Sequence, residues 1–422
     1  MKKKLFLLTT EFPYGDGEKS FIIPELEYLI KEFDITIISS ASSDARYDLS
    51  KTTALDKNIN VLWYPNDKMG NMEKIRYSMQ ALLSPAFLYD AGSIIREHKR
   101  IIQRISYSMQ FYAYSLRMHS WIKKKFTQEM AKGAIIYSFW LYIPVMAAAM
   151  LKNEYGNFKL VSRAHGFDLY NERVPGGRQP FRSFIDKQLD KILFIAETGY
   201  KYYLNNIVHI ETNHMTDVTE KYIVCHMGVK PSKLSERSCD GIFRIVSCSS
   251  VIPLKRIYLI IDALSEISNI KIYWTHFGDG SCMNEMKRYA NNKISAKENI
   301  EYKFVGNVLN GAVRSYYGNN PVDLFITASE TEGCPVSIQE AMASGIPVIG
   351  TAVGEIPLMI QGNGYVISKN PSSKEMAEKI EKLANQSANE ILVMRDASYK
   401  LWDEKYNSDK NYSQLLNELM EL

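Results

Sequence analysis

The chain has 422 residues, of which 46% are hydrophobic and 23% are charged, and such fractions are typical of a folded globular protein rather than a disordered one. The formal net charge of +4 is small for this length and gives no basis for nucleic acid as a main partner. The 5 cysteines include no CxxC pair and no histidine at ligand spacing, which argues against a zinc site and against a disulfide framework.

Short apolar runs alternate with amphipathic segments along the first half of the chain. The first run, Lys4–Thr9, is followed by a loop with two glycines, by helical spacing over Ser20–Lys31 and by a second run at Ile35–Ile38. Similar units recur at Ala134–Tyr137, Pro144–Leu151, Lys159–Ser162 and Lys191–Ile195. Buried strands that alternate with helices predict a parallel sheet, so we expect an α/β domain over residues 1–229.

A polar stretch without periodicity, residues 230–240, separates this series from a second one and is predicted to be a linker. The second series predicts another α/β domain over residues 241–404. Its expected strands and helix are Phe243–Cys248, Ile257–Ile267, Lys271–His276, Tyr302–Val305, Asp323–Thr327 and Pro347–Ile349. No run reaches about 18 apolar residues, so we expect no membrane-spanning helix and a cytoplasmic protein.

The most informative segment, residues 329–350, follows the predicted strand that ends at Thr327. Pro335 suits the first position of a helix, because that position needs no amide donor, and Gly345 suits the end of one. A helix is therefore predicted from about Pro335 to Ser344. Its first amides have no partner within the helix, so together with the helix dipole they form a seat for an anion such as a diphosphate.

Two glutamates flank this helix start. Glu340 lies four residues after Val336 and so shares a helix face with it, while Glu332 on the preceding loop can reach the same space. Carboxylates on either side of a phosphate seat suit the hydroxyls of a sugar and of a ribose. A pair of glutamates at this separation is more often two solvated surface carboxylates. A binding role for them therefore depends on the residues around them.

The whole segment resembles the C-terminal signature of family-four glycosyltransferases of the GT-B fold, in which two glutamates precede an Ala-Met-Ala-x-Gly-x-Pro-Val run. The matching residues are Glu332, Glu340, Ala341, Met342, Ala343, Gly345, Pro347 and Val348. The resemblance implies two Rossmann-like, doubly wound parallel-sheet domains that face an interdomain cleft, with the donor on the C-terminal domain and the acceptor on the N-terminal one. It also implies that a helix at about residues 405–422 packs back on the first domain.

By this resemblance, Glu332 holds the hydroxyls of the donor sugar and is a catalytic candidate, and Glu340 binds the ribose. The backbone of the loop between them is expected to contact sugar and phosphate, through Gly333, Cys334, Pro335, Val336 and Ser337. Lys255 matches a lysine that clamps the diphosphate in the family. The Gly-Arg pair that usually precedes it is replaced by Ser249 and Ser250, a departure for which the neighbouring Arg256 is expected to compensate.

Glycines after other strands complete the expected donor site. Gly278, Gly306 and Asn307 lie where the family places its nucleotide-base pocket, although glycines there also simply form turns. Gly17 lies in the first glycine-containing loop, which in similar enzymes lines the cleft near the donor phosphate. The loop around Leu358 departs from the family pattern, and its role stays open.

The N-terminal domain carries a dense polar cluster after the strand Lys159–Ser162. His165 is similar to the histidine of the family's His-Gly loop and is the second catalytic candidate. Weaker candidates for acceptor binding are Arg163, Asp168, Trp140 and Glu18. For Trp140, buried packing is an equally good interpretation, and a lone histidine is more often structural than functional.

Residues 93–132 interleave nine Lys and Arg residues with aromatic side chains such as Phe111, Tyr112 and Trp121. A basic amphipathic surface of this kind can lie on anionic lipid, and an ordinary solvated helix pair is an equally good interpretation. A lipid-linked glycan acceptor would account for it.

The resemblance implies a retaining transfer of a hexose-type sugar from a UDP- or GDP-linked donor to a glycan or polyprenyl-linked glycan, in envelope, capsule or exopolysaccharide synthesis. It implies no metal and no further cofactor. A catalytically silent binding subunit, kept open by Ser250 and Leu358, and a phosphorylase or epimerase on the same fold are the alternatives.

Overall fold

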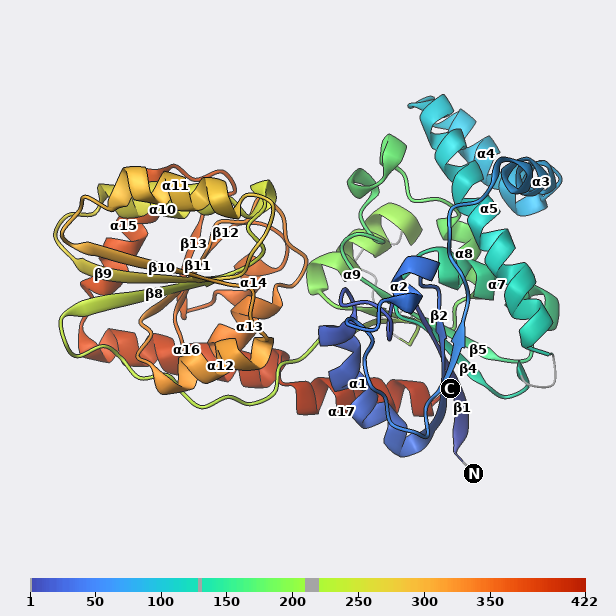
Figure 1. Cartoon of the computed structure of the whole chain (residues 1–422). Helices are drawn as coiled ribbons and strands as arrows, with labels where there is room; N and C mark the ends of the chain where they lie inside the picture. The colour runs from blue at the N-terminus through green and yellow to red at the C-terminus, as the bar shows by residue number, and fades with distance from the viewer. Residues whose placement is uncertain (1, 128–130, 209–219) are drawn as a thin grey trace. The chain divides into compact units, whose positions relative to one another are not determined.

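The computed structural model describes residues 2–127, 131–208 and 220–422, and the chain divides into two compact units (Figure 1). The first unit comprises Met1–Cys225 and Tyr412–Leu422, and the second comprises His226–Asn411. Both are parallel α/β units, as the alternation of strands and helices in the sequence predicts.

The first unit is built on a seven-stranded sheet with the order β3-β2-β1-β4-β5-β6-β7, in which all pairs are parallel. Its strands are β1 Lys3–Thr9, β2 Phe33–Ser39, β3 Asn60–Trp63, β4 Ile135–Ser138, β5 Lys159–Ala164, β6 Lys191–Phe194 and β7 Tyr222–Val224. The central strands are buried on both faces, and for this reason they read in the sequence as continuous apolar runs. The edge strands β3 and β7 are short and were not predicted.

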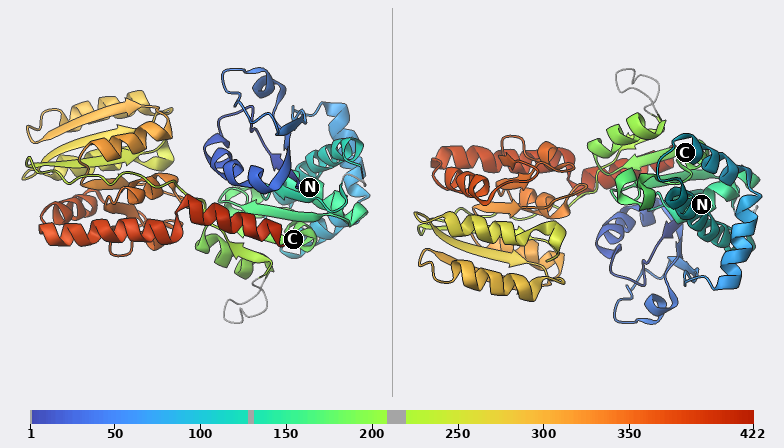
Figure 2. Two further views of the ribbon diagram at one scale, coloured as in Figure 1. Left: turned by 90° about the horizontal axis from the view of Figure 1, so that it is seen from below. Right: turned by 90° about the horizontal axis from the view of Figure 1, so that it is seen from above.

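Helices cover both faces of this sheet. They are α1 Lys19–Glu32, α2 Ser43–Tyr47, α3 Asn71–Leu82, α4 Pro85–Arg96, α5 Ile101–Lys125, α7 Ile143–Tyr155, α8 Arg182–Gln188, α9 Glu197–Tyr203 and α17 Ser408–Met420. Helix α7 is buried all round from Pro144 to Leu151 and fills the centre of one face. Helices α3 and α4 pack on α5 rather than on the sheet (Figures 1 and 2).

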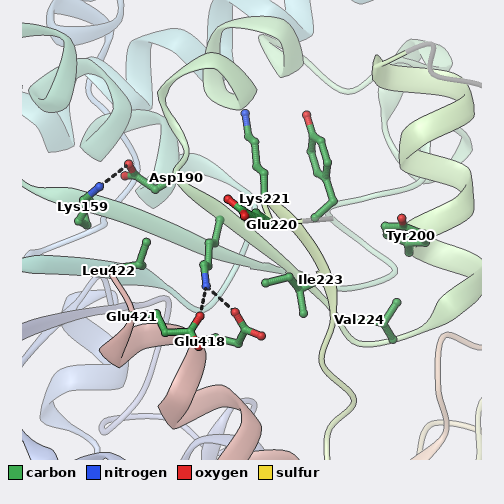
Figure 3. Close-up of a pocket in the computed structure, with 12 residues that line it drawn as sticks. Lys159, Asp190, Tyr200, Glu220, Lys221, Ile223, Val224, Glu418, Glu421 and Leu422 are labelled. Carbon is green, nitrogen blue, oxygen red and sulfur yellow. Dashed lines mark hydrogen bonds and ion pairs between the residues drawn. The ribbon is translucent and has the colours of Figure 1, made fainter. Parts of the chain in front are cut away.

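Helix α17 joins the core of the first unit although it ends the chain. Tyr412, Leu415 and Leu419 lie in one apolar cluster with Leu26 and Leu29 of α1. At the amino ends of β5 to β7, Lys191 donates to Glu418 and, at 3.3 Å, to Glu421, while Lys159 lies 3.5 Å from Asp190 (Figure 3). These groups line a cavity of about 870 Å³. Ligands of parallel sheets bind at the carboxyl ends of strands, whereas this cavity lies at the amino ends. We therefore infer that the ion pairs of Lys191 attach α17 to the sheet rather than bind a ligand.

Replacing Lys191 with methionine should lower the free energy of unfolding by about 2 kcal/mol, since it leaves the carboxylate of Glu418 half-buried without its cation. Denaturant unfolding of the full chain measures the change. Lys201→Met on α9, an exposed lysine, is the control and should change stability little. Equal stability of the two variants would contradict the role given to Lys191.

The second unit has a six-stranded parallel sheet with the order β10-β9-β8-β11-β12-β13. Its strands are β8 Ile242–Cys248, β9 Lys271–Phe277, β10 Ile300–Gly306, β11 Leu324–Thr327, β12 Val348–Thr351 and β13 Gly364–Ile367. Its helices are α10 Ile257–Glu266, α11 Met283–Ile294, α12 Asn310–Asn319, α13 Val336–Ala343, α14 Ile356–Met359, α15 Ser373–Ala384 and α16 Ala388–Lys405. Helices α10, α11 and α15 cover one face, and α12, α13 and α16 cover the other (Figure 1).

The stretch predicted as a linker, residues 230–240, packs on the second unit. The Ser235 amide donates to the Ser344 carbonyl at 2.9 Å, and the Val322 amide donates to the Glu236 carbonyl at 3.1 Å. The boundary therefore lies at residues 225 and 226, and the polar composition of 230–240 reflects a surface segment attached by backbone hydrogen bonds.

Residues 93–132, which the sequence suggests as a basic amphipathic surface, do not form one continuous surface in the structure. Most of these residues form α5, which buries Phe111 and Tyr112 in the core, and Phe126 just after the helix is buried too. Residues 128–130 lie outside the described residues. Among the helices of the described ranges, none combines the length and the hydropathy that a bilayer-spanning segment requires.

Candidate functional site

Three loops of the second unit meet at the carboxyl ends of β8, β11 and β12. The Glu330 amide, after β11, donates to the Leu254 carbonyl, after β8, at 2.8 Å. The Glu355 amide, after β12, donates to the Gly333 carbonyl at 2.9 Å. These backbone bonds make the loops one structure, at the edge of a parallel sheet where ligands bind.

The loop after β12 approaches the Glu332 loop so closely that Gly354 has no room for a side chain. Its φ is +54°, and a Cβ there would lie 2.3 Å from the Glu332 carbonyl oxygen. Real Cβ atoms do not approach an oxygen so closely, so only glycine lets the two loops keep this spacing.

Gly354→Ala should therefore displace the Glu332 loop and lower activity at least about tenfold. Gly362→Ala is a matched control, because Gly362 also has a positive φ, +82°, but no atom lies within 4 Å of a Cβ there. The control should lose about 1–2 kcal/mol of stability through backbone strain and keep its kcat/KM. An unchanged kcat/KM in Gly354→Ala would contradict the assignment of the Glu332 loop to the functional site.

Lys255 and Glu332 form an ion pair at this edge. Lys255 ends a short 3-10 turn, Pro253–Lys255, after β8, and its Nζ donates to Oε1 of Glu332. Both side chains remain partly open to solvent, 23% for Lys255 and 13% for Glu332. Two residues that lie 77 positions apart, and that were singled out separately in the sequence, are thus brought together.

Helix α13 begins at Val336, one residue later than predicted, with Pro335 as its N-cap. Proline offers no side-chain acceptor, and no side-chain hydrogen bond caps the helix. The amides of the first turn, including Val336 and Ser337, have no acceptor within the helix and are suited to an anion. Cys334 lies beside this turn and accepts from Nε2 of Gln339 at 3.2 Å; burial raises the pKa of its thiol, which makes it a poor nucleophile.

Glu340 lies on α13 and is 5% exposed. Burial raises the pKa of its carboxyl to about 7, and the charge of Arg314 on α12 lowers it in part. Burial and the charge of Glu340 together raise the pKa of Cys248 at the end of β8. The Glu340 carboxylate therefore lies near the carboxyl end of β8, where the loops meet. Arg314 belongs to no sequence motif and comes near Glu340 only because α12 packs beside α13, so the sequence does not point to it.

Arg256 was predicted to contact the donor, and in the structure it has partners within the second unit. Its Nε donates to the Ala328 carbonyl at 2.6 Å, and its terminal nitrogens donate to the Ser329 and Lys369 carbonyls at 3.0 and 2.9 Å. The side chain is buried and holds the ends of neighbouring loops. These hydrogen bonds account for the guanidinium within the unit, and donor binding by Arg256 stays a prediction.

Gly278 and Gly306 lie beside these loops, with the Gly278 amide donating to the Gly306 carbonyl at 2.8 Å. A Cβ on Gly278 would lie 1.9 Å from the Ser249 carbonyl oxygen, so the close approach of backbones explains this glycine. Asn307 follows β10 and is exposed. Base binding by these residues stays a prediction.

In the first unit, the Glu18 carboxylate holds the loop after β1. It accepts from the amides of Thr10, Glu11 and Phe12 at 2.7–3.1 Å and from Nε1 of Trp140. It is 2% exposed, and these hydrogen bonds account for the carboxylate; acceptor binding by Glu18 stays a prediction. Gly17, which precedes it, is exposed, and its predicted role is untouched by this finding.

Arg163 and Asp168 also have partners within the first unit, and acceptor binding by either stays a prediction. Arg163 is fully buried and pairs with Glu25 at 3.0 Å and with the Tyr137 hydroxyl at 2.9 Å. Asp168 is fully buried and accepts from the amides of His165 and Leu141 at 2.7 and 2.6 Å. Their polarity, which suggested a binding cluster, stabilises the ends of β4 and β5.

His165 keeps its status as a candidate. Its ring packs on Trp140 at 4.3 Å and on Phe139 at 4.9 Å between ring centroids. Within the described ranges neither ring nitrogen has a hydrogen-bond partner, and Nδ1 lies 3.8 Å from the Asp168 carboxylate. The residue is 8% exposed, and its two ring nitrogens lack a hydrogen-bond partner in the part of the chain that the structure describes.

Residues 243–386, which contain Lys255, Glu332, Glu340 and the three loops, match the family model described as glycosyl transferases group 1. The second unit is therefore similar to group 1 glycosyl transferases over most of its length. The ion pair, the start of α13 and Glu340 all lie within the matched residues.

Similar proteins extend the comparison beyond these residues. The O-antigen biosynthesis glycosyltransferase WbnH and the probable O-antigen biosynthesis glycosyltransferase WbiN, both of Escherichia coli, are each 24% identical over 264 residues, which cover 60% of this chain and 68% of theirs.

Solved structures match over the full length. The apo form of the lipopolysaccharide outer core galactosyltransferase WaaB has a TM-score of 0.66 at 13% identity and covers 99% of each chain. Anabaena Alr3699/HepE in complex with UDP has a TM-score of 0.66 at 14% identity and covers 100% of each chain. The fold is thus GT-B, with two parallel-sheet α/β units.

Proposed function

We propose that this glycosyltransferase transfers a hexose-type sugar from a UDP- or GDP-linked donor to a glycan or lipid-linked glycan of a cell-surface polysaccharide, with retention at the anomeric carbon. The observation that carries the proposal is the Lys255–Glu332 pair beside the uncapped start of α13. A cation, a row of amides and two carboxylates within one loop system match the parts of a nucleotide sugar.

The residues divide the donor between them in this proposal. Lys255 and the first amides of α13 hold the diphosphate, whose negative charge both attract. Glu332 accepts from hydroxyls of the sugar, and Glu340 accepts from the ribose. When the donor binds, its phosphates draw Lys255 from Glu332, which frees the carboxylate for the sugar. His165 is the candidate on the acceptor side, and the reaction is proposed to need no metal.

The names of similar proteins support the choice of substrate class. WbnH and WbiN are named for O-antigen biosynthesis, WaaB for the lipopolysaccharide outer core, and HepE was solved with UDP and with UDP-glucose. These describe those proteins, and they favour a cell-surface polysaccharide and a uridine nucleotide for this one.

Calorimetry and turnover with a panel of UDP- and GDP-sugars test the proposal. One nucleotide sugar should bind and be consumed, and NMR of the product should show the anomeric configuration of the donor. Failure of every nucleotide sugar to bind would favour a silent subunit. Release of a sugar phosphate in phosphate buffer, without any nucleotide, would indicate a phosphorylase.

A further inference from the structure

Exposed apolar side chains gather on one helical region of the first unit. Of 20 large hydrophobic residues that are exposed in the described part of the chain, 9 lie between residues 72 and 102. They are Met72, Ile75, Met79, Leu82, Leu83, Leu88, Tyr89, Ile95 and Ile102, and their exposed fractions run from 50% to 87%. Scattered apolar residues are ordinary on a surface, whereas a group of this size within one short segment indicates contact with an apolar partner.

Helix α3 is apolar on two opposite faces. Tyr77 and Ala81 are buried, and Tyr77 packs in a cluster with Ala113 of α5. At about 100° per residue, Met72, Ile75 and Met79 form a stripe on the face turned away from these two. The face with Tyr77 and Ala81 is covered by packing within the unit, whereas the face with Met72, Ile75 and Met79 is exposed.

Helix α4 likewise exposes apolar side chains, on the faces next to its buried one. Phe87 and Ile94 are buried, while Leu88 and Ile95, which are separated by two helical turns, are exposed together with Tyr89. Both helices pack on α5 (Figure 1), and their buried residues share apolar clusters with residues of α5. Their outer faces and the first turn of α5 make up what we call the α3–α4 patch.

Unpaired cations surround these apolar residues. Within 67–102 the exposed cations are Lys68, Lys74, Arg76, Arg96, Lys99 and Arg100, and the exposed acids are Asp67, Glu73 and Glu97, an excess of three positive charges. Glu97 is paired with Arg104 and with Arg178, at 3.0 Å to the latter, and Asp67 accepts from Ser43 at 2.6 Å. In the described ranges none of the six cations belongs to an ion pair, so all six are available.

We propose that the α3–α4 patch docks this protein on an anionic lipid bilayer. Apolar side chains that enter the acyl boundary, with Lys and Arg at the level of the headgroups, are the two attractions by which helices lie on membranes. A second copy would place the same positive patch against itself across a two-fold axis, which like charges oppose. The inference does not depend on the proposed reaction, since it needs neither donor nor acceptor.

The surface lies mostly outside the stretch that the sequence indicated. Only residues 93–102 are common to both, because the aromatic residues of the central part of α5 are buried. The exposed apolar stripe of α3 begins more than twenty residues earlier, at Met72.

Sedimentation of the full chain with lipid vesicles tests the proposal. The protein should bind vesicles of phosphatidylcholine with phosphatidylglycerol, and bind phosphatidylcholine alone far more weakly. Two variants, Met72→Ser with Ile75→Ser and Met79→Ser, and Lys74→Glu with Arg96→Glu and Lys99→Glu, should each lose at least about tenfold in binding. All six positions are exposed, so both variants should fold, which circular dichroism checks.

A control variant carries Leu392→Ser and Val393→Ser, which are exposed to 57% and 65% on α16 of the second unit, and it should bind vesicles like the wild type. The proposal is overturned if the wild type shows no preference for anionic vesicles, or if the serine variant binds as tightly as the wild type. It is also overturned if light scattering shows a dimer that the serine variant dissociates, because the patch would then be covered by a second copy.

Discussion

Lys255→Met should lower kcat/KM for sugar transfer by about a hundred- to a thousandfold. Lys255 is the partly exposed cation of the loop system, whereas Arg256 is buried and donates to backbone carbonyls, and Ser250 stands where the family pattern has an arginine. Its loss leaves the leaving diphosphate with helix amides alone. Steady-state kinetics with the donor found by panel screening measures the effect.

Lys287→Met on α11 is the control for this prediction, because Lys287 is exposed and has no ion pair among the described residues. It should retain wild-type kinetics. Calorimetry with the free nucleoside diphosphate separates binding from chemistry, and Lys255→Met should weaken this binding as well. Wild-type kcat/KM in Lys255→Met would remove the main support for the proposed function.

Glu340→Gln should stabilise the protein while it weakens nucleotide binding. Burial raises the pKa of Glu340 from 4.5 to about 7, so the folded state holds a proton that the unfolded state releases. Stability from this group is complete below pH 4.5 and is lost as the pH rises to about 7. Above pH 7 the wild type bears the full cost of a buried carboxylate, and the glutamine variant should be more stable by about 3 kcal/mol.

Denaturant unfolding between pH 4 and pH 8 measures this gain, which should grow with pH. Nucleotide affinity should fall by about ten- to a hundredfold, since an amide accepts fewer hydrogen bonds from a ribose diol than a carboxylate does. Glu378→Gln, an exposed glutamate of α15, should change neither quantity. If Glu340→Gln gains no stability at pH 8, the wild-type protein does not bear the cost of an ionised, buried carboxylate at this position.

The strands of both sheets could be predicted because they are buried on both faces. Runs such as Lys4–Thr9 and Lys271–His276 agree with β1 and β9 to within one residue at either end. The edge strands β3, β7 and β13 have three or four residues, of which few are fully buried, and they leave no continuous apolar run to detect. Length matters too, because the edge strand β10 is also only partly buried, yet its seven residues include the predicted strand Tyr302–Val305.

In the candidate site, prediction succeeded where the backbone sets the geometry. The turn residues around Pro335 predict the start of α13 to within one residue, and with it the placing of Glu340 on that helix. Arg163, Glu18 and Arg256 have partners within the protein that the sequence does not indicate. A polar side chain after a strand can face a ligand or a backbone carbonyl or amide, and only the packed structure distinguishes the two.

Because α17 packs in the first unit, the two sequence segments of that unit are synthesised before and after the whole of the second unit. Tyr412, Leu415 and Leu419, which complete the core around α1, leave the ribosome only after residues 226–411 have been made. The second unit, whose residues are contiguous, has everything it needs to fold earlier. The core around α1 is therefore completed after the second unit has been made, and a nascent chain exposes the apolar face of α1 until α17 has been synthesised.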